Sequence, residues 1–260
     1  MIDSHAHLGL ARADEAELVA EARRVGVTRI LTVGIDEESN REAVRAAHEF
    51  EGVFAAVGRH PNSAEGFDAE AAAAIEELAT DDAVRAIGET GLDYYRDSAS
   101  EEAQVLAFEA QIGIARRTQL PLVIHVRDSS GPGSGRAVAD CFELLAAEAG
   151  GVEVILHCFS ATPERAEEAA GRGWHVSFAG NVTYPKSEEL RVAATLIPER
   201  QLLVETDSPY LAPAPHRGKL NTPALVPFVA RQLAETKGLP LDQVARATWD
   251  NATRVFGLPA

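Results

Sequence analysis

Short apolar segments alternate with longer amphipathic segments along most of the chain. The apolar segments are rich in β-branched residues and have the length of buried strands. Eight of them occur, at Met1–Ala6, Arg29–Gly34, Val53–Gly58, Val84–Glu89, Leu122–Val126, Val154–Phe159, His175–Phe178 and Leu202–Thr206. The segments with apolar residues at helical spacing are Glu15–Val25, Glu37–Phe50, Ala69–Leu78, Glu101–Thr118, Ala137–Ala149, Glu164–Arg172 and Ser187–Leu196.

This alternation predicts the fold class. Apolar strands separated by helices are typical of a parallel sheet covered by helices, and eight such repeats are the number that closes a barrel. A Pro-rich loop, Leu211–Pro223, and two helical segments ending at Phe256 follow the eighth strand. Since the sequence contains no linker-like stretch, we expect an α/β protein with one (β/α)8 TIM barrel over residues 1–260, and a functional site at the C-terminal face of its strands.

Composition places the chain among globular proteins. Hydrophobic residues make up 46% and charged residues 25% of the 260 residues, and no apolar run approaches the ~20 residues needed to span a bilayer. The start of the chain has no basic region followed by an apolar one, so no signal peptide is predicted. Two cysteines, Cys141 and Cys158, do not make a disulfide framework. We therefore expect a cytoplasmic protein that does not engage a membrane and shows no obligate protein partner.

The formal net charge is −16, which argues against a broad basic surface that coats duplex DNA. A solubility effect explains this charge most simply. Bound dications and a few arginines can still reverse the potential at one site of an acidic protein. Any contact with nucleic acid is therefore expected to be local.

Residues of the types that commonly bind metals, histidine, aspartate and glutamate, lie at the ends of several predicted strands. In a parallel barrel these ends converge on one face. The residues are His5, His7, Glu89, His125, His157, Glu205 and Asp207. Any one of these histidines could be a hydrogen-bonded rim residue, but burying the whole set would cost several kcal/mol per unpaired charge, and dications compensate for that cost. Nitrogen and oxygen ligands without a thiolate suit Zn, Mn or Mg, and the sequence leaves this choice open.

The remaining histidines and one cysteine are assigned by their positions. Strand alternation turns Cys158 away from the neighbouring His157, so it is predicted to be a packed thiol. His48 within a helix and His175 at the opposite end of a strand are interpreted as structural. His60, after the third strand, is expected to face substrate, and His216 is left open between function and structure.

Six short motifs occur in order across nearly the whole chain. They are Asp3–Leu8, Val57–Pro61, Gly88–Tyr95, Pro121–Asp128, His157–Ser160 and Glu205–Leu211. Together they resemble the TatD-type deoxyribonucleases, a branch of the metal-dependent hydrolase barrels, and the segments Arg217–Pro223 and Asn251–Phe256 resemble the tail of that family. Three positions depart from the family pattern, namely Arg59, Asn62 and Ala161. They concern the shape of loops and the substrate more than the metal ligands.

The resemblance implies two divalent metal ions. By position, His5, His7 and Asp207 would hold one metal, His125 and His157 would hold the other, and Glu89 would bridge them.

Two dications ~3.5–4 Å apart activate water and stabilise an in-line displacement at phosphorus. In the expected reaction Asp207 ligates metal and accepts a proton, and Glu205 is a possible second base or occasional ligand. Candidate substrate contacts follow from the same motifs. A phosphate could be neutralised by His60, Arg59 and Arg127. Asp93 is a further candidate contact, and either of the next two residues, Tyr94 and Tyr95, could stack on a terminal base.

The most favoured function is a metal-dependent 3′-5′ exodeoxyribonuclease that acts on single-stranded or frayed DNA, because few basic residues can grip only a strand end. The alternative is an ester or amide hydrolase, such as a D-aminoacyl-tRNA deacylase, since the same centre activates water against carbonyl carbon. A third hypothesis is a catalytically idle barrel that serves as a binding or scaffold protein. Retention of every ligand position disfavours it.

Overall fold

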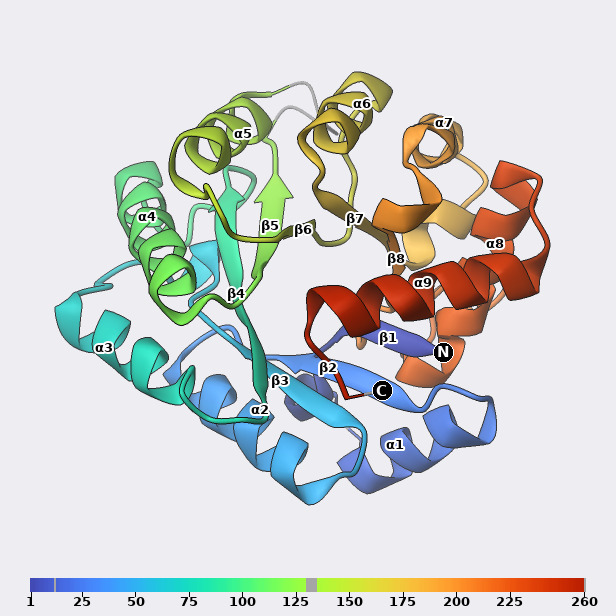
Figure 1. The fold of residues 1–260 in the computed structure, drawn as a ribbon, viewed down its shortest axis with the longest axis horizontal. Helices are drawn as coiled ribbons and strands as arrows, with labels where there is room; N and C mark the ends of the chain where they lie inside the picture. The colour runs from blue at the N-terminus through green and yellow to red at the C-terminus, as the bar shows by residue number, and fades with distance from the viewer. Residues whose placement is uncertain (12, 130–134, 260) are drawn as a thin grey trace.

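The computed structural model describes residues 1–11, 13–129 and 135–259. Eight parallel strands lie side by side in sequence order (Figure 1). They are β1 (Ile2–Ala6), β2 (Arg29–Val33), β3 (Val53–Val57), β4 (Val84–Asp93), β5 (Leu122–Arg127), β6 (Val154–Leu156), β7 (His175–Phe178) and β8 (Leu202–Val204). The helices are α1 (Glu15–Arg24), α2 (Glu37–Glu49), α3 (Ala69–Leu78), α4 (Glu101–Thr118), α5 (Arg136–Glu148), α6 (Pro163–Arg172), α7 (Glu188–Leu196), α8 (Val226–Lys237) and α9 (Leu241–Val255). The strands curl into a nearly closed barrel with the helices outside, which confirms the predicted fold class.

The first and last strands meet through a buried seam. The Asp3 carboxylate accepts hydrogen bonds from the Thr206 amide at 2.8 Å and from its hydroxyl at 2.5 Å. Further along, the Asp207 amide donates to the His5 carbonyl at 2.9 Å. These bonds hold the segment after β8 against β1, so residues some 200 positions apart in the chain are fixed beside each other.

Side-chain caps explain where several helices begin. The Asp36 side chain accepts from the Ser39 amide in a capping box that starts α2, and Asp68 and Ser100 cap α3 and α4 in the same manner. At the other end, Gly173 takes a left-handed conformation that ends α6. Each cap lies at a helix boundary that the sequence predicts to within a few residues.

Helix α9 closes the N-terminal end of the barrel. Figure 1 shows it lying over β1 and β8, and the Asn251 amide on α9 donates to the carbonyl of Leu202, the first residue of β8. Inward-facing strand residues and the end of α9 form one apolar cluster, which contains Ile2, Leu31, Val33, Ala56, Ala86, Val123, Ile155, Leu203, Ala252, Val255, Phe256 and Leu258. Because this end is filled, the C-terminal ends of the strands are left to form the site.

Three strand ends differ from the sequence prediction by two residues or more. β6 ends at Leu156 instead of Phe159, and β8 ends at Val204 instead of Thr206. The chain turns there because Cys158 and Asp207 have left-handed backbones, with φ of 43° and 54°. β4 instead continues to Asp93, with a change of register after Ile87.

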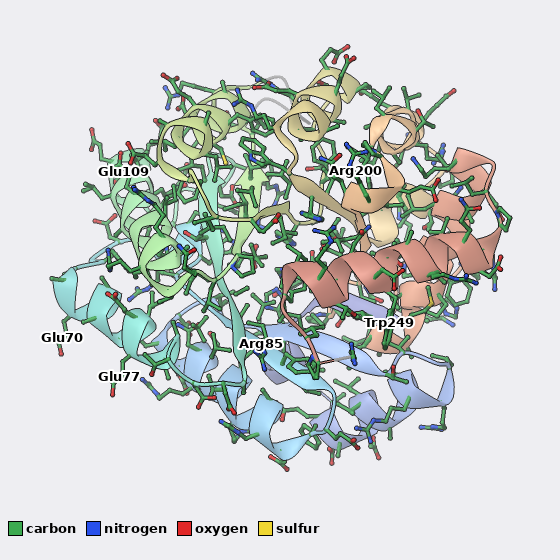
Figure 2. All side chains as sticks on the ribbon, in the orientation of Figure 1. Glu70, Glu77, Arg85, Glu109, Arg200 and Trp249 are labelled. Atoms are coloured by element: carbon green, nitrogen blue, oxygen red, sulfur yellow. The ribbon has the colours of Figure 1, made fainter. Side chains whose placement is uncertain are left out.

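Much of the acidic charge lies on the outer helices. Figure 2 shows Glu70 and Glu77 on α3 and Glu109 on α4 pointing away from the barrel, and all three are exposed. The negative charge of these helices is therefore separated from the end of the barrel where the strand-end histidines gather.

None of the described helices is both long and apolar enough to cross a bilayer.

Candidate metal centre

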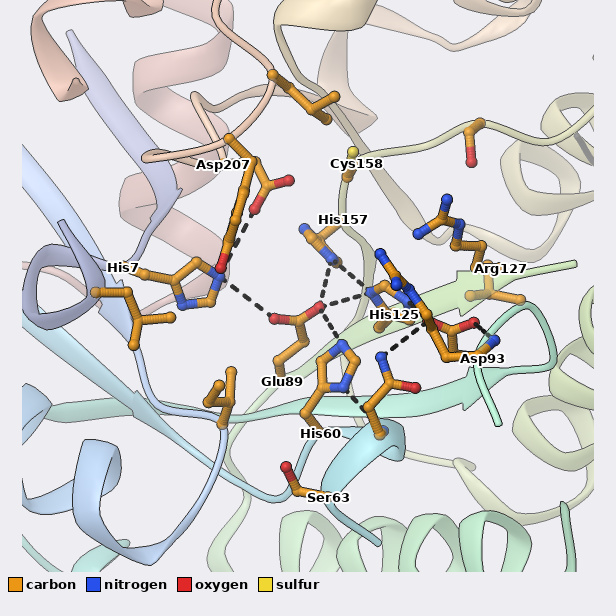
Figure 3. Close-up of a pocket in the computed structure, with 18 of the residues that line it drawn as sticks. His7, His60, Ser63, Glu89, Asp93, His125, Arg127, His157, Cys158 and Asp207 are labelled. Carbon is orange, nitrogen blue, oxygen red and sulfur yellow. Dashed lines mark hydrogen bonds and ion pairs between the residues drawn. The ribbon is translucent and has the colours of Figure 1, made fainter. Parts of the chain in front are cut away.

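Glu89 lies among five histidines, of which Figure 3 labels His7, His60, His125 and His157. Its Oε2 is 3.4 Å from Nε2 of His5 and 3.6 Å from Nε2 of His7. Its Oε1 is 2.7 Å from Nδ1 of His125 and 2.8 Å from Nε2 of His157. Oε2 thus faces His5 and His7, while Oε1 faces His125 and His157.

Asp207 completes the first of these two groups. Its Oδ1 is 3.6 Å from Nε2 of His7, and donor atoms of His5, His7 and Asp207 all lie within 4.8 Å of one another. A second such group contains His5, Glu89 and His157, and a third contains Glu89 and His125 together with His60. The six ligand positions predicted from sequence therefore converge in one place.

Two glycines allow the backbone around Glu89 to adopt its path. Gly88 and Gly91 have φ of 146° and 140°, which side-chain-bearing residues rarely adopt. A Cβ on Gly88 would lie 2.5 Å from the Val123 carbonyl oxygen, and one on Gly91 would collide with the His125 carbonyl. These glycines let β4 pass close to β5, so that Glu89 and His125 can meet.

Hydrogen bonds to the far nitrogens orient the imidazoles. Nδ1 of His7 is 2.8 Å from the Val33 carbonyl, which can only accept, so Nδ1 carries the proton and Nε2 is left with a free lone pair. Nδ1 of His157 is 3.2 Å from Glu205 Oε1. A histidine that binds a metal commonly donates its other N–H to such an acceptor. The residues therefore fit divalent metal ions on the side that faces Glu89.

The protonation states of His5 and Glu89 agree with this donor set, whereas the neighbouring carboxylates, against the effect of burial, raise the pKa of His7, His125 and His157. Burial lowers the pKa of His5 to about 3, and the neighbouring His157 adds to the effect. Burial alone would raise the pKa of Glu89, yet the charges of His157 and His60 hold it well below its usual range. Neutral imidazole and ionised carboxylate are the forms that bind a dication. Moreover, Nε2 of His5 and Nε2 of His7 lie only 3.3 Å apart, which favours a cation between their lone pairs.

Glu205 lies behind His157 and does not line the cavity. It is fully buried, and its Oε1 accepts from the Cys158 amide at 2.7 Å as well as facing His157. In this place Glu205 can orient the imidazole of His157, and its role as a second base or occasional ligand stays a prediction.

Cys158 also differs from its predicted placement. It lines the cavity, whereas strand alternation turned it away. β6 ends at Leu156, and the left-handed backbone of Cys158 reverses the expected direction. Burial raises the pKa of its thiol well above the usual value, so the sulfur is kept as a neutral thiol.

A cavity of about 670 Å³ opens above these ligands. Among the residues predicted to contact substrate, His60, Asp93 and Arg127 line it. Nε2 of His60 is 3.5 Å from Glu89 Oε1, and Asp93 Oδ2 is 3.4 Å from Nε2 of His125. Asp93 thus supports a histidine, while Arg127 presents an exposed guanidinium to the cavity.

Three side chains predicted to contact substrate do not line the cavity, namely Arg59, Tyr94 and Tyr95, and the ring of Tyr95 packs against the Arg127 guanidinium. Arg59 forms an ion pair with Glu37 and donates to the Ser63 carbonyl. The Tyr94 hydroxyl donates to Asp140 on α5 at 3.1 Å. Both side chains come from loops at the correct end of the barrel, but each turns to a partner that is distant in sequence.

The other histidines occupy structural positions. His48 is exposed and lies 2.9 Å from Asp81, and Nε2 of the buried His175 accepts a hydrogen bond from the Arg254 guanidinium at 3.1 Å. The ring of His216 packs edge-on against Phe228 and does not line the cavity.

Several cavity residues escaped the sequence interpretation. They are Asn62, Ser63, Arg96, Ser98, Ser160, Asn181 and Tyr210. Most are uncharged residues in loops, and only their positions after strands could have indicated them. Ser160 and Tyr210 lie inside two of the six motifs, His157–Ser160 and Glu205–Leu211, so these two carried a usable signal.

Comparison with known proteins gives the family. The family model TatD related DNase matches residues 2–257. The chain belongs to this family. It is 41% identical to the uncharacterized metal-dependent hydrolase TatD of Mycobacterium tuberculosis, over 99% of this chain and 98% of that protein. It is 34% identical to the 3′-5′ ssDNA/RNA exonuclease TatD of Cronobacter sakazakii, over 94% of this chain and 92% of that protein.

Solved structures agree with this assignment. The TatD homologue YjjV of Escherichia coli superimposes with a TM-score of 0.91 at 26% identity, covering 100% of this chain and 98% of that one. The resemblance seen in the six motifs is thereby confirmed. The chain is a metal-dependent hydrolase of the TatD family.

Proposed function

We propose that this protein removes nucleotides from the 3′ ends of single-stranded or frayed DNA. The observation that carries the proposal is Glu89, whose two oxygens face separate histidine pairs at the floor of the cavity. In this proposal His5, His7 and Asp207 hold one dication, His125 and His157 hold a second, and Glu89 contacts both. When bound, two such ions activate water and stabilise the charge that develops at phosphorus.

The protein's own residues bind the reacting phosphodiester and move its proton. Asp207 is partly exposed to the cavity, so its carboxylate can accept the proton that water releases as it attacks. Arg127 presents its guanidinium to the phosphate, and His60 stands beside Glu89 at the cavity wall. Asp93 and Glu205 lie behind His125 and His157, where each orients an imidazole.

The shape and charge of the site favour a strand end. α9 fills the opposite end of the barrel, so the cavity has no second opening through the barrel axis. Among the residues that the structure describes, Arg96 and Arg127 are the arginines that line it, whereas a duplex-coating surface needs many cations. A relative that shares 34% of its residues is named a 3′-5′ ssDNA/RNA exonuclease, which supports both the polarity and the substrate class.

The test is hydrolysis of a 3′-labelled single-stranded oligonucleotide by chelator-treated protein with Mg²⁺, Mn²⁺ or Zn²⁺ added back. Terminal nucleotides should be released only with metal. Glu89→Gln should lower the rate by more than about a hundredfold, the upper end of the losses that outer-shell partners alone cause. Glu109→Gln, which makes the same charge change on the outer face of α4, should leave the rate unchanged.

Two outcomes would contradict the proposal. Efficient cleavage of covalently closed circular DNA would exclude a requirement for an end. Hydrolysis of an aminoacyl ester offered side by side, with no release of nucleotides, would instead favour the carbonyl hydrolase alternative.

A further inference from the structure

Tyr210 is exposed at the rim of the cavity, on the side of the first metal-ligand group. It lines the cavity, and 55% of its surface is accessible. Its ring centre lies 6.3 Å from that of His7, with the two planes inclined by 70°. The aromatic ring therefore stands directly beside a residue that is proposed to hold metal.

The backbone that carries this ring is fixed. The Tyr210 amide donates to the Asp207 carbonyl at 2.9 Å. The fully buried Asn221 side chain donates to the Tyr210 carbonyl at 2.5 Å and to the Thr206 carbonyl at 2.8 Å. The ring is thus mounted on the same short segment as Asp207, and an aromatic group that is already ordered binds a ligand at a low entropic cost.

In the described part of the chain, the ring of Tyr210 also lacks the guanidinium that lies over each of the other tyrosine rings. The chain has four tyrosines. A guanidinium lies over the ring of each of the other three: Arg136 on Tyr94 at 5.0 Å, Arg127 on Tyr95 at 3.9 Å and Arg217 on Tyr184 at 4.5 Å. Within residues 1–11, 13–129 and 135–259, no cation or parallel ring covers Tyr210 in the same manner.

We propose that Tyr210 is the stacking platform for a nucleobase next to the phosphodiester that is cleaved. A base has a flat π-face of the size of the tyrosine ring, and such stacking is independent of sequence because every base has this face. The proposal rests on the proposed nuclease function and specifies how the substrate is recognised. It also gives a reason for single-strand preference, because an internal base of a duplex has both faces covered by its neighbours.

The first experiment compares normal oligonucleotides with oligonucleotides that lack one base, either at the 3′-terminal or at the penultimate position. The wild-type kcat/KM should fall by about 5- to 150-fold for one of these abasic substrates, the range expected for one stacked base. In Tyr210→Ala this preference should shrink towards unity while turnover of that abasic substrate stays at the wild-type level. Tyr210→Phe keeps the ring and should retain the preference.

Leu220→Ala is the matched control. Leu220 belongs to the same loop and is 48% exposed, but it does not line the cavity, so both the rate and the preference should stay unchanged. Equal losses on normal and abasic substrates in Tyr210→Ala, or an unchanged preference, would overturn the stacking role.

A second measurement separates this proposal from the nuclease function. An oligonucleotide carries the fluorescent base 2-aminopurine at whichever position, 3′-terminal or penultimate, the abasic substrates identify. If they identify neither, both positions are labelled in turn. The oligonucleotide is titrated with metal-free protein, so that hydrolysis does not interfere. Stacking on Tyr210 should quench the fluorescence in the wild type and in Tyr210→Phe, but not in Tyr210→Ala. Quenching without hydrolysis would refute the nuclease function alone, whereas quenching that survives in Tyr210→Ala, or no quenching at all, would refute the stacking platform.

Discussion

Replacement of Glu205 by Gln should weaken metal binding without removing a catalytic group. Glu205 is fully buried, and its Oε1 accepts from the Cys158 amide at 2.7 Å and lies 3.2 Å from Nδ1 of His157. The opposite nitrogen of this imidazole points at Glu89, 2.8 Å away. A carboxylate that accepts from Nδ1 fixes the ring and makes the other nitrogen a better ligand.

The magnitude follows from the type of hydrogen bond that is lost. A bond to a charged group is worth about 1.5–3 kcal/mol and a neutral one about 0.5–1.5 kcal/mol. Glutamine keeps the shape and loses the charge, so the change should cost about 1–1.5 kcal/mol, or roughly tenfold in affinity for the metal that His157 holds. This is the lower end of the range for outer-shell partners of metal-binding histidines.

The assay is titration of chelator-treated protein with buffered Mn²⁺ or Zn²⁺, followed by kcat over the same range of metal concentration. Glu205→Gln should need about ten times more metal, and kcat should return to near the wild-type value once metal is saturating. Asp128→Asn is a suitable control, because Asp128 is another buried carboxylate that caps α5 through the Ala137 amide. Unchanged metal affinity with a lasting loss of kcat would refute this reasoning and favour the second-base role.

Three further predictions concern stability and charge. Burial, reinforced by Arg254, lowers the pKa of His175 to about 4 from 6.5. The resulting contribution to the free energy of unfolding, about 3 kcal/mol, is complete above pH 6.5 and is lost as the pH falls towards 4. Urea unfolding should therefore show a steeper loss of stability with acid in the wild type than in His175→Gln. Lys237→Met should cost about 2–3 kcal/mol in the same assay, because the Lys237 ammonium donates to the Ala194 and Ile197 carbonyls at 2.9 and 2.8 Å. Arg127→Ala should reduce the salt dependence of single-strand binding by about 0.7 in the slope of log K against log salt, the value for one phosphate contact, and an unchanged slope would remove Arg127 from the phosphate site.

The fold could be predicted because it depends on local pattern. Each strand is an apolar run that both the barrel interior and the helices bury, so eight runs and their spacing are sufficient to indicate the topology. The ends of β6 and β8 were placed too late, since Cys158 and Asp207 turn through a left-handed backbone. Neither residue type reveals such a conformation in sequence, because contacts after the strand impose it.

The proposed metal ligands are easier to predict from the sequence than the substrate contacts. A ligand at the end of a strand is placed by the strand itself, so order along the chain was sufficient to group Glu89 with the histidines. Side chains in loops are directed by their partners. Arg59 turns to Glu37 and Tyr94 turns to Asp140, and neither pairing follows from a period of two or of 3.6 residues.

An acidic protein and a polyanionic substrate are compatible here because the barrel separates the charges in space. Glu70, Glu77 and Glu109 project from outer helices, and at 0.15 M salt exposed charges are screened beyond about 8 Å. Within the cavity, dications and arginines such as Arg96 and Arg127 would set the local potential. Such a site gains little from long-range attraction and must gain affinity from contacts with the last nucleotides. An exposed, rigidly mounted ring such as that of Tyr210 provides a contact of this kind, since stacking on a base does not depend on the net charge of the protein.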